Sequence, residues 1–301
     1  MHRLETVASV AISVVLLSCT ASAVPVDGTL DPQYGMALST QTTETSLGDQ
    51  PDNLLYGSEL DQAYGYVSGD TLHLLLTGSF NRYFGEPIIL PNSLHLYVDD
   101  RPGGQNELSG NNPMVGAYAG LQSMTGLRFD ADFAPDFWLG GALESSGPEP
   151  FVAYYAELPA GGGGAGYRLG STSTNGPGTL SGANNPFGIL ASIDVSNSAG
   201  VTAGCDAASG AGVTTGIEWA IPLAAIGSPS GTIRVCALLA SAGPSGVVSN
   251  QVLGPVPPGT CSLGSAAGVD FESVPGVQYF LIDAATPVKQ SSWGRLKAAY
   301  R

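Results

Sequence analysis

Glycine and proline interrupt this chain so often that little room is left for a long helix. The sequence holds 42 Gly and 21 Pro in 301 residues, while only 12% of its residues are charged. Long helices favour charged and straight-chain residues, and glycine and proline destabilise a helix interior. Between the interruptions the chain prefers Val, Tyr and Thr, which suit strands. The pattern therefore predicts an all-β protein of short strands joined by turns.

The clearest strand signal is a hairpin early in the chain. Residues 60–67 and 71–77 are both strand-like, and residues 68–70 between them form a turn sequence, Ser-Gly-Asp. Residues 93–98 are a further strand pattern that ends in a cluster of turn formers. Roughly ten such runs without an internal repeat predict a single antiparallel β-sandwich, jelly-roll-like, over residues 24–285.

The first 23 residues are typical of an export signal. A short n-region precedes an apolar run over residues 7–17, and Ala21-Ser22-Ala23 is a conventional cleavage site. That run is shorter than the roughly 20 residues of a membrane-spanning helix, and no later run reaches that length. We therefore expect an extracellular or cell-surface protein without a transmembrane span. The segment that ends at Cys19 resembles a lipobox, so lipid anchoring at Cys19 is the alternative to free secretion.

The formal net charge of −15 argues against two classes of partner. Nucleic acids and anionic membranes both repel an acidic surface. Calcium is compatible with such a surface, because it binds several oxygen ligands. The predicted calcium ligands are aspartates that lie close together in the sequence, namely Asp99, Asp100, Asp130, Asp132 and Asp136. The alternative is that these aspartates are solvated residues of acidic loops.

Export permits a disulfide, and the mature chain keeps three cysteines. Cys236 lies in a strand pattern and is expected to be a buried apolar residue. Cys205 and Cys261 both lie in loops rich in Gly and Ser, so we predict that these two pair. No cysteine spacing suggests zinc.

The last sixteen residues, 286–301, differ from the body of the chain because they are basic and aromatic. Ser291-Ser292 can cap a short helix, and Trp293 and Tyr300 would then lie on one face of it. Together with Arg295 and Lys297, these residues define a predicted C-terminal tail. Such a short helix is marginal alone, so it needs this domain or a partner to dock on.

One segment of the chain resembles a known family. Residues 216–227 are similar to the Glu-x-x-Ile-Pro-Leu/Trp-x-x-Leu-Gly segment of family 9 carbohydrate-binding modules, which are DOMON-like β-sandwiches. Residues 72–77 and 93–99 resemble two of their strands. Residues 249–254, Ser-Asn-Gln-Val-Leu-Gly, match a stretch of bacterial secreted proteins of unknown function. The resemblance covers about residues 55–282 in pieces and implies a β-sandwich. Within residues 216–227, the part after Ile221 reads as one helical turn closed by glycine.

The resemblance also implies a place for a ligand. Sugar-binding members hold the sugar between two tryptophans, and only Trp138 and Trp219 can serve in this chain. Flat aromatic rings stack on the apolar faces of sugars. Tyr154 and Tyr155, in a strand pattern over residues 151–158, complete the predicted ligand-binding set. The alternative for each ring is an aromatic pair inside the sandwich.

The sequence contains no convincing catalytic constellation. It lacks Gly-x-Ser-x-Gly, and both His73 and His95 lie in strand patterns rather than on loops beside an activated serine. Paired carboxylates for glycoside hydrolysis occur in any acidic protein. We therefore predict a non-enzymatic protein that binds a polysaccharide or another extracellular polymer, such as a cell-surface or matrix protein. A self-assembling structural subunit is the alternative, and a hydrolase is kept only as a residual hypothesis.

Overall fold

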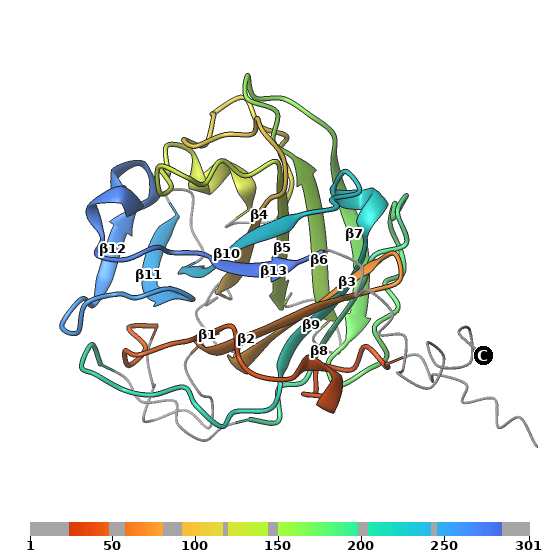
Figure 1. Ribbon diagram of the computed structural model, residues 1–301, viewed down its shortest axis with the longest axis horizontal. Helices are drawn as coiled ribbons and strands as arrows, with labels where there is room; N and C mark the ends of the chain where they lie inside the picture. The colour runs from red at the N-terminus through yellow and green to blue at the C-terminus, as the bar shows by residue number, and fades with distance from the viewer. Residues whose placement is uncertain are drawn as a thin grey trace, which may run out of the picture.

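The protein is built from two antiparallel β-sheets that pack face to face (Figure 1). The computed structural model describes residues 24–47, 58–80, 92–116, 120–143, 150–197, 204–241 and 246–284. Within these ranges the helices are five 3-10 segments: η1 Pro32–Tyr34, η2 Leu121–Met124, η3 Leu223–Ile226, η4 Ala266–Gly268 and η5 Phe271–Ser273. The predicted all-β sandwich is confirmed.

The smaller sheet has five strands in the order β1-β2-β3-β9-β8. Their bounds are β1 Ser39–Thr40, β2 Glu59–Ser68, β3 Thr71–Ser79, β8 Leu190–Ile193 and β9 Gly216–Pro222. β2 and β3 form the predicted hairpin, in which Ser68 pairs with Thr71. Gly69 in the turn has a φ of +58°, a left-handed conformation that costs glycine little.

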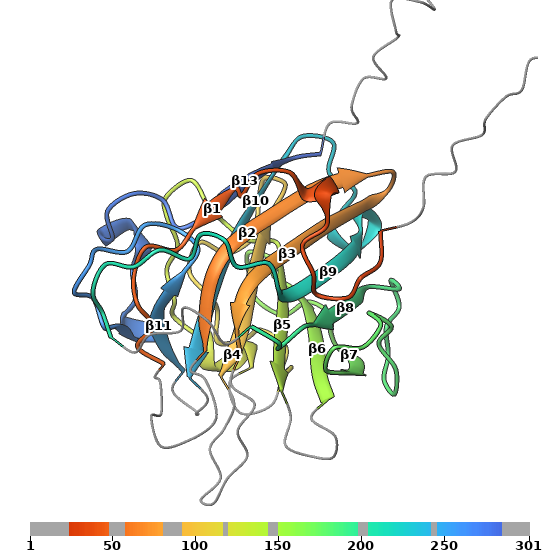
Figure 2. The same cartoon turned by 90° about the horizontal axis from the view of Figure 1, so that it is seen from below.

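The larger sheet has eight strands, seven of them in the order β12-β11-β10-β4-β5-β6-β7. Their bounds are β4 Ser93–Asp99, β5 Phe137–Leu143, β6 Pro150–Glu157, β7 Gly166–Ser173, β10 Thr232–Ser241, β11 Val247–Val252 and β12 Ser262–Ser265. The eighth strand, β13 Phe280–Asp283, pairs with the first half of β10, while β11 pairs with its second half. In Figure 2, β2 and β3 cross the direction of β5 and β6.

Alternate residues of the strands fill the space between the sheets. The fully buried members of this core include Leu72, Leu74 and Leu76 of β3 and Leu94, Leu96 and Val98 of β4. Successive side chains of a strand point to opposite faces, so a period of two predicts which residues enter a core. Burial of one such leucine stabilises the fold by roughly 1.5–3 kcal/mol.

The outer face of the larger sheet is not exposed to solvent. The long connections between the strands of this sheet cover it. Tyr97 of β4 points away from the central core and packs edge-on against Phe129, with ring centroids 4.8 Å apart. Phe129 in turn lies 6.2 Å from Phe271, which belongs to the connection between β12 and β13. These contacts form a second hydrophobic core outside the sandwich proper.

The outer face of the smaller sheet is covered by the N-terminal segment, residues 24–38. Tyr34 packs edge-on against Tyr66 of β2 at a centroid distance of 5.0 Å, and Tyr66 stacks on His73 of β3 at 4.7 Å. Burial lowers the pKa of His73, because a charged imidazole would lose hydration there.

A buried carboxylate fastens this N-terminal segment to the sheet. Glu218 of β9 is 0% exposed, and its Oε2 accepts hydrogen bonds from the backbone N–H groups of Asp27 and Gly28 at 2.8 and 2.9 Å. Tyr34 donates its hydroxyl to Oε1 at 2.8 Å. Burial raises the pKa of Glu218, and the hydrogen bonds oppose that rise. The glutamate of the resembled motif therefore has a structural role in this protein.

Loss of this carboxylate should destabilise the fold strongly. Glu218→Ala leaves two backbone N–H groups and a tyrosine hydroxyl without their acceptor, so we expect about 3 kcal/mol less free energy of unfolding in urea. Tyr34→Phe removes only one of the three hydrogen bonds and should cost about 1 kcal/mol. Equal losses from the two variants would contradict the role of Glu218 as the common acceptor.

Side-chain amides join the two sheets beside β1. Gln41 donates its Nε2 hydrogen to the carbonyl oxygen of Val252 at 2.8 Å. Asn250 and Gln251 donate in the opposite direction, to the carbonyl oxygen of Glu44, at 2.7 and 3.1 Å. All three amide residues are at most 1% exposed. The Ser-Asn-Gln stretch noted in the sequence thus satisfies backbone groups between the sheets.

A strap formed by residues 204–212 continues this junction and carries the disulfide. Ala208 donates its N–H to Thr42, and Asp206 accepts from Glu44, both at 2.9 Å, so the strap pairs with the chain after β1. Cys205 of the strap is bonded to Cys261, just before β12, as predicted. Cys236 is free and buried, as expected.

The described strands at the sheet edges are short or partly covered. β1 has two residues, and β8 and β12 have four each. The longer edge strand β7 has eight residues, but Ser171 within it exchanges two backbone hydrogen bonds with Ser181. Long open edges favour pairing with other chains, and the described edge strands β1, β8 and β12 are too short to offer one.

Several predictions for the two ends of the chain lie outside the described residues. These are the signal segment 1–23 with Cys19, and the tail 286–301 with its predicted helix and with Trp293, Arg295, Lys297 and Tyr300. Across residues 24–284, where the chain is described, no helix is long and apolar enough to cross a membrane. The predicted single turn after Ile221 is confirmed as η3, which Gly227 closes with a φ of +78°.

Candidate functional site

The four aromatic residues predicted to bind a ligand are buried. Trp138 is 1% exposed, Trp219 0%, Tyr154 7% and Tyr155 0%. Trp219 lies between the sheets, whereas Trp138 lies under the connections that cover the larger sheet. A ring enclosed by protein has no free face for a sugar, so the burial of these four rings gives the predicted stacking no support. The physical reason is that strand alternation tells which face a ring takes but not whether a loop covers that face.

One serine–histidine pair is in contact, but its arrangement does not suit catalysis. Ser93 Oγ lies 2.9 Å from His95 Nε2, and Trp138 donates its indole N–H to His95 Nδ1 at 3.1 Å. An indole nitrogen can only donate, so Nδ1 accepts and Nε2 of the neutral ring carries the proton. A triad histidine needs an electron pair on the nitrogen that faces the serine. His95 therefore does not serve as a base toward Ser93.

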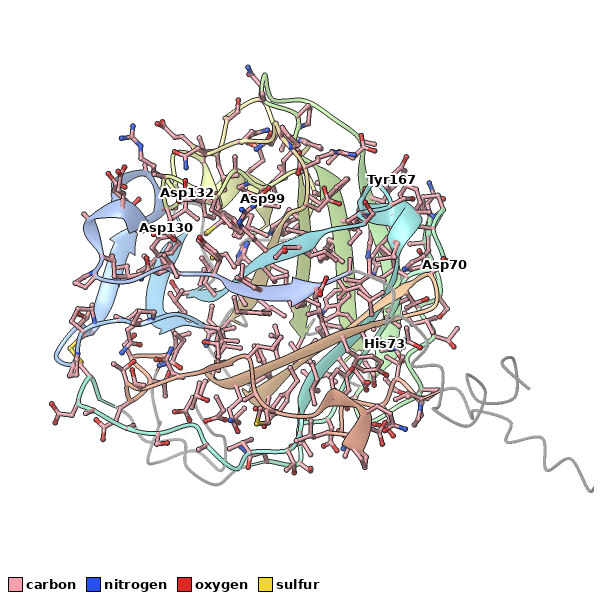
Figure 3. The ribbon with its side chains drawn as sticks, viewed as in Figure 1. Asp70, His73, Asp99, Asp130, Asp132 and Tyr167 are labelled. Carbon is pink, nitrogen blue, oxygen red and sulfur yellow. A yellow bond between two sulfur atoms is a disulfide. The ribbon has the colours of Figure 1, made fainter. Side chains whose placement is uncertain are left out.

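The predicted calcium residues converge more closely than the aromatic ones. Asp99, Asp100 and Asp132 line one cavity of about 360 Å³, where β4 ends. Figure 3 labels two of them, Asp99 and Asp132. Asp136 lies beside them at the start of β5, where its Oδ2 accepts from the backbone N–H groups of Asp100 and Arg101, both at 3.3 Å. The sequence grouping of these four residues is thus a spatial grouping too.

Asp130 is separate from this group. Its Oδ2 accepts a hydrogen bond from the backbone N–H of Gln278 at 2.8 Å, which ties the connection before β5 to the one before β13. Burial raises the pKa of Asp130, and that hydrogen bond opposes the rise. Its role is to hold two connections together.

Two arginines share the cavity with the aspartates. Arg101 Nε lies 3.5 Å from Asp136 Oδ1, and the guanidinium of Arg101 stacks over the ring of Phe137 at 4.7 Å. Arg234 of β10 lies 3.5 Å from Asp99 Oδ2. The two arginine side chains remain 49% and 38% exposed. We call this site the Asp–Arg cavity; it is lined by Asp99, Asp100, Arg101, Asp132, Ala134 and Arg234, among others.

Asp100 is the most unusual carboxyl of this site. Its side chain is only 1% exposed, and neither carboxyl oxygen has a hydrogen-bond partner. Burial and the neighbouring charge of Asp136 raise the pKa of Asp100 to about 7, while Arg101 opposes the rise. Both causes favour the protonated form of the Asp100 carboxyl, and that form can donate a hydrogen bond.

The predicted calcium site is not found. Within the described ranges, no group of three or more His, Cys, Asp or Glu side chains is placed to hold a metal ion. The physical reason lies in the two arginines: Asp99 and Asp136 already face a guanidinium, and Asp136 also accepts two backbone hydrogen bonds. A cation would have to displace these partners before it reached the carboxylates.

A second cavity of about 440 Å³ is lined in part by the connection between η3 and β10. We call it the turn cavity, because the turn between β2 and β3 forms one wall; Figure 3 labels Asp70 at that turn. Its lining includes Asp70, Leu223, Ser228, Pro229, Ser230 and Ala284.

The sequence predicts neither the role of Arg101 and Arg234 in this site nor the turn cavity. Arg234 stands in a strand pattern and Arg101 in a run of turn formers, and nothing local predicts that they meet the same aspartates. A weak signal was present: Lys and Arg together number only 10 in 301 residues, and Arg101 directly follows the predicted ligands Asp99 and Asp100.

Comparison of the chain with protein-family models, with curated proteins and with solved structures found no match in any of the three. The sandwich agrees with the fold that the resemblance to carbohydrate-binding modules implies, but no family is identified. Function must therefore be argued from the site itself.

Proposed function

We propose that the protein binds a glycan chain outside the cytoplasm, without catalysis, and that the Asp–Arg cavity is the binding site. The observation that carries the proposal is the mixture of acceptors and donors around one open cavity. Asp132 is exposed there, and Arg101 and Arg234 are about half and one third exposed. Adjacent sugar hydroxyls both donate and accept, so they match carboxylate and guanidinium groups set side by side.

The charges of the site restrict the class of glycan. Three aspartates line the cavity and Asp136 lies beside it, and each arginine already faces at least one of these four carboxylates. The whole chain also carries a formal charge of −15. Uronate-containing or sulfated polysaccharides would meet like charge both at long range and within the site. The proposed ligand is therefore an uncharged or amine-bearing polysaccharide.

Two further observations support binding outside the cytoplasm over the alternatives. The disulfide is typical of an oxidising compartment and fits the export signal of the sequence. Short edge strands within the described ranges give little support to assembly through sheet edges. Assembly at the cell surface and hydrolysis are supported by no specific contact among the described residues.

The proposal predicts a loss of binding from changes in the cavity. Arg234→Gln and Asp132→Ala should each weaken binding of the mature protein to uncharged oligosaccharides by about ten-fold or more on an array and in calorimetry, because a hydrogen bond to a charged group contributes about 1.5–3 kcal/mol. Arg128→Gln is the matched control, since Arg128 is an exposed arginine paired with Glu107 away from the cavity. If both cavity variants keep the affinity of the parent protein, or if the parent protein binds no oligosaccharide, the proposal is wrong.

A further inference from the structure

We infer that the binding site extends across both cavities, so that the protein recognises an extended stretch of glycan chain rather than a single sugar. This inference rests on the proposed function. It adds the turn cavity as a second subsite, next to the Asp–Arg cavity.

The two cavities flank one short connection, residues 227–231 between η3 and β10. Ser228, Pro229 and Ser230 of this connection line the turn cavity. On its other side, a Cβ atom built on Gly227 would lie only 2.3 Å from Nη1 of Arg101, which lines the Asp–Arg cavity. The connection therefore contacts one subsite through Gly227 and the other through the three residues that follow.

Because Gly227 has no side chain, it places no bulky group between the two subsites. It has a left-handed φ of +78° and no side chain, and any Cβ there would displace the Arg101 guanidinium. Arg101 thus lies at the boundary and can bond a ligand that crosses it. The planar guanidinium group of arginine carries five N–H donors, so it can bond several hydroxyl groups of a glycan chain that passes over it.

The turn cavity has the chemistry of a sugar subsite rather than of an apolar pocket. Asp70, Ser228 and Ser230 offer hydrogen-bonding groups, while half-buried Leu223 and Pro229 offer apolar surface. The backbone of Asp70 is already fixed, because its carbonyl oxygen accepts from the N–H of Leu223 at 2.8 Å. The wall of the cavity is therefore set by a backbone contact and leaves the Asp70 carboxylate for a ligand.

The volumes agree with one ligand segment in each subsite. Both cavities, at about 440 and 360 Å³, lie within the roughly 300–1,000 Å³ range of cavities that hold drug-sized ligands. When two subsites bind one chain, the second contact is intramolecular, so affinity rises without a new partner. A chain long enough to span residues 227–231 should therefore bind more tightly than a short one.

The test uses cello-oligosaccharides and chito-oligosaccharides of increasing length with the whole mature protein. We expect at least a ten-fold rise in affinity between the disaccharides and the hexasaccharides in one of the two series. Ser230→Trp, which fills the turn cavity from an exposed position, should abolish that rise in affinity with chain length. Ser209→Trp, at an exposed position on the strap, is the control for an added tryptophan.

The outcomes separate this inference from the proposed function. If disaccharides and hexasaccharides bind equally, or if Ser230→Trp leaves the gain with length intact, the two-subsite inference is wrong while glycan binding in the Asp–Arg cavity stands. If neither series binds at any length, both fall. Thermal unfolding of each variant checks that the added side chain has not disturbed the fold.

Discussion

Replacement of Cys205 and Cys261 by serine is expected to lower the free energy of unfolding by about 4 kcal/mol. The disulfide closes a loop with a sequence separation of 56 residues. In the chain-entropy model, a cross-link of this span removes conformational freedom from the unfolded chain that is equivalent to about 4 kcal/mol. That is a large share of the roughly 5–15 kcal/mol that stabilises an ordinary domain.

The position of the bond adds to this effect. Cys205 belongs to the strap that pairs with residues 41–45, and Cys261 lies just before β12 of the larger sheet. The backbone N–H of Gly259 also donates to the carbonyl oxygen of Cys205 at 2.6 Å. Opening the disulfide therefore frees the strap from the larger sheet as well as relaxing the unfolded chain.

Urea denaturation of the double serine variant beside the parent protein measures the loss. The parent protein in excess dithiothreitol is the matched control, since it has the same side chains apart from the broken bond. Its unfolding midpoint should fall to that of the double variant. A parent protein whose midpoint does not move on complete reduction would show that the cross-link adds no stability.

The strands and their local pairing could be predicted from the sequence, whereas the loops that cover the sheets could not. The hairpin of β2 and β3 follows from local pattern, because a Gly-Asp turn joins two runs whose alternate residues are apolar. The pairing of Cys205 with Cys261 could also be predicted, since the third cysteine lies in a strand and is buried. Both inferences needed only local information.

The ligand site depended on contacts that no local pattern contains. Trp138 follows strand alternation to an outer face, yet connections rich in phenylalanine cover that face. The aspartates at the ends of β4 and β5 were grouped correctly, but Arg234 reaches them from a strand more than 90 residues later in the sequence. A cation was predicted where the fold supplies guanidinium groups of its own.

Two buried carboxyls on β2 should make the protein less stable as the pH rises. Glu59 is 3% exposed and Asp61 2%, and each has an oxygen with no hydrogen-bond partner. Burial raises the pKa of Glu59 to about 8, with Asp61 and Glu44 as neighbouring negative charges, and burial raises the pKa of Asp61 to about 7. The unfolded chain releases the same protons near pH 4. The folded form therefore holds protons that the unfolded form loses, so the stability that these two groups contribute is fully present below about pH 4 and is lost as the pH rises toward 8.

The expected result is a free energy of unfolding that drops by about 3 kcal/mol or more between pH 5 and pH 8, since each such group contributes up to about 1.4 kcal/mol per pH unit. Glu59→Gln has nearly the same shape but no proton to lose, so it should match the parent protein near pH 5 and exceed it by about 2 kcal/mol at pH 8. Urea denaturation across this range measures both curves, with Glu272→Gln, an exposed glutamate, as the control that keeps the parent slope. Parallel curves for the parent and Glu59→Gln would mean that Glu59 is ionised at the same pH in both states. In that case the unpaired oxygen of Glu59 would reach water in solution, and the face of β2 at Glu59 would have to open.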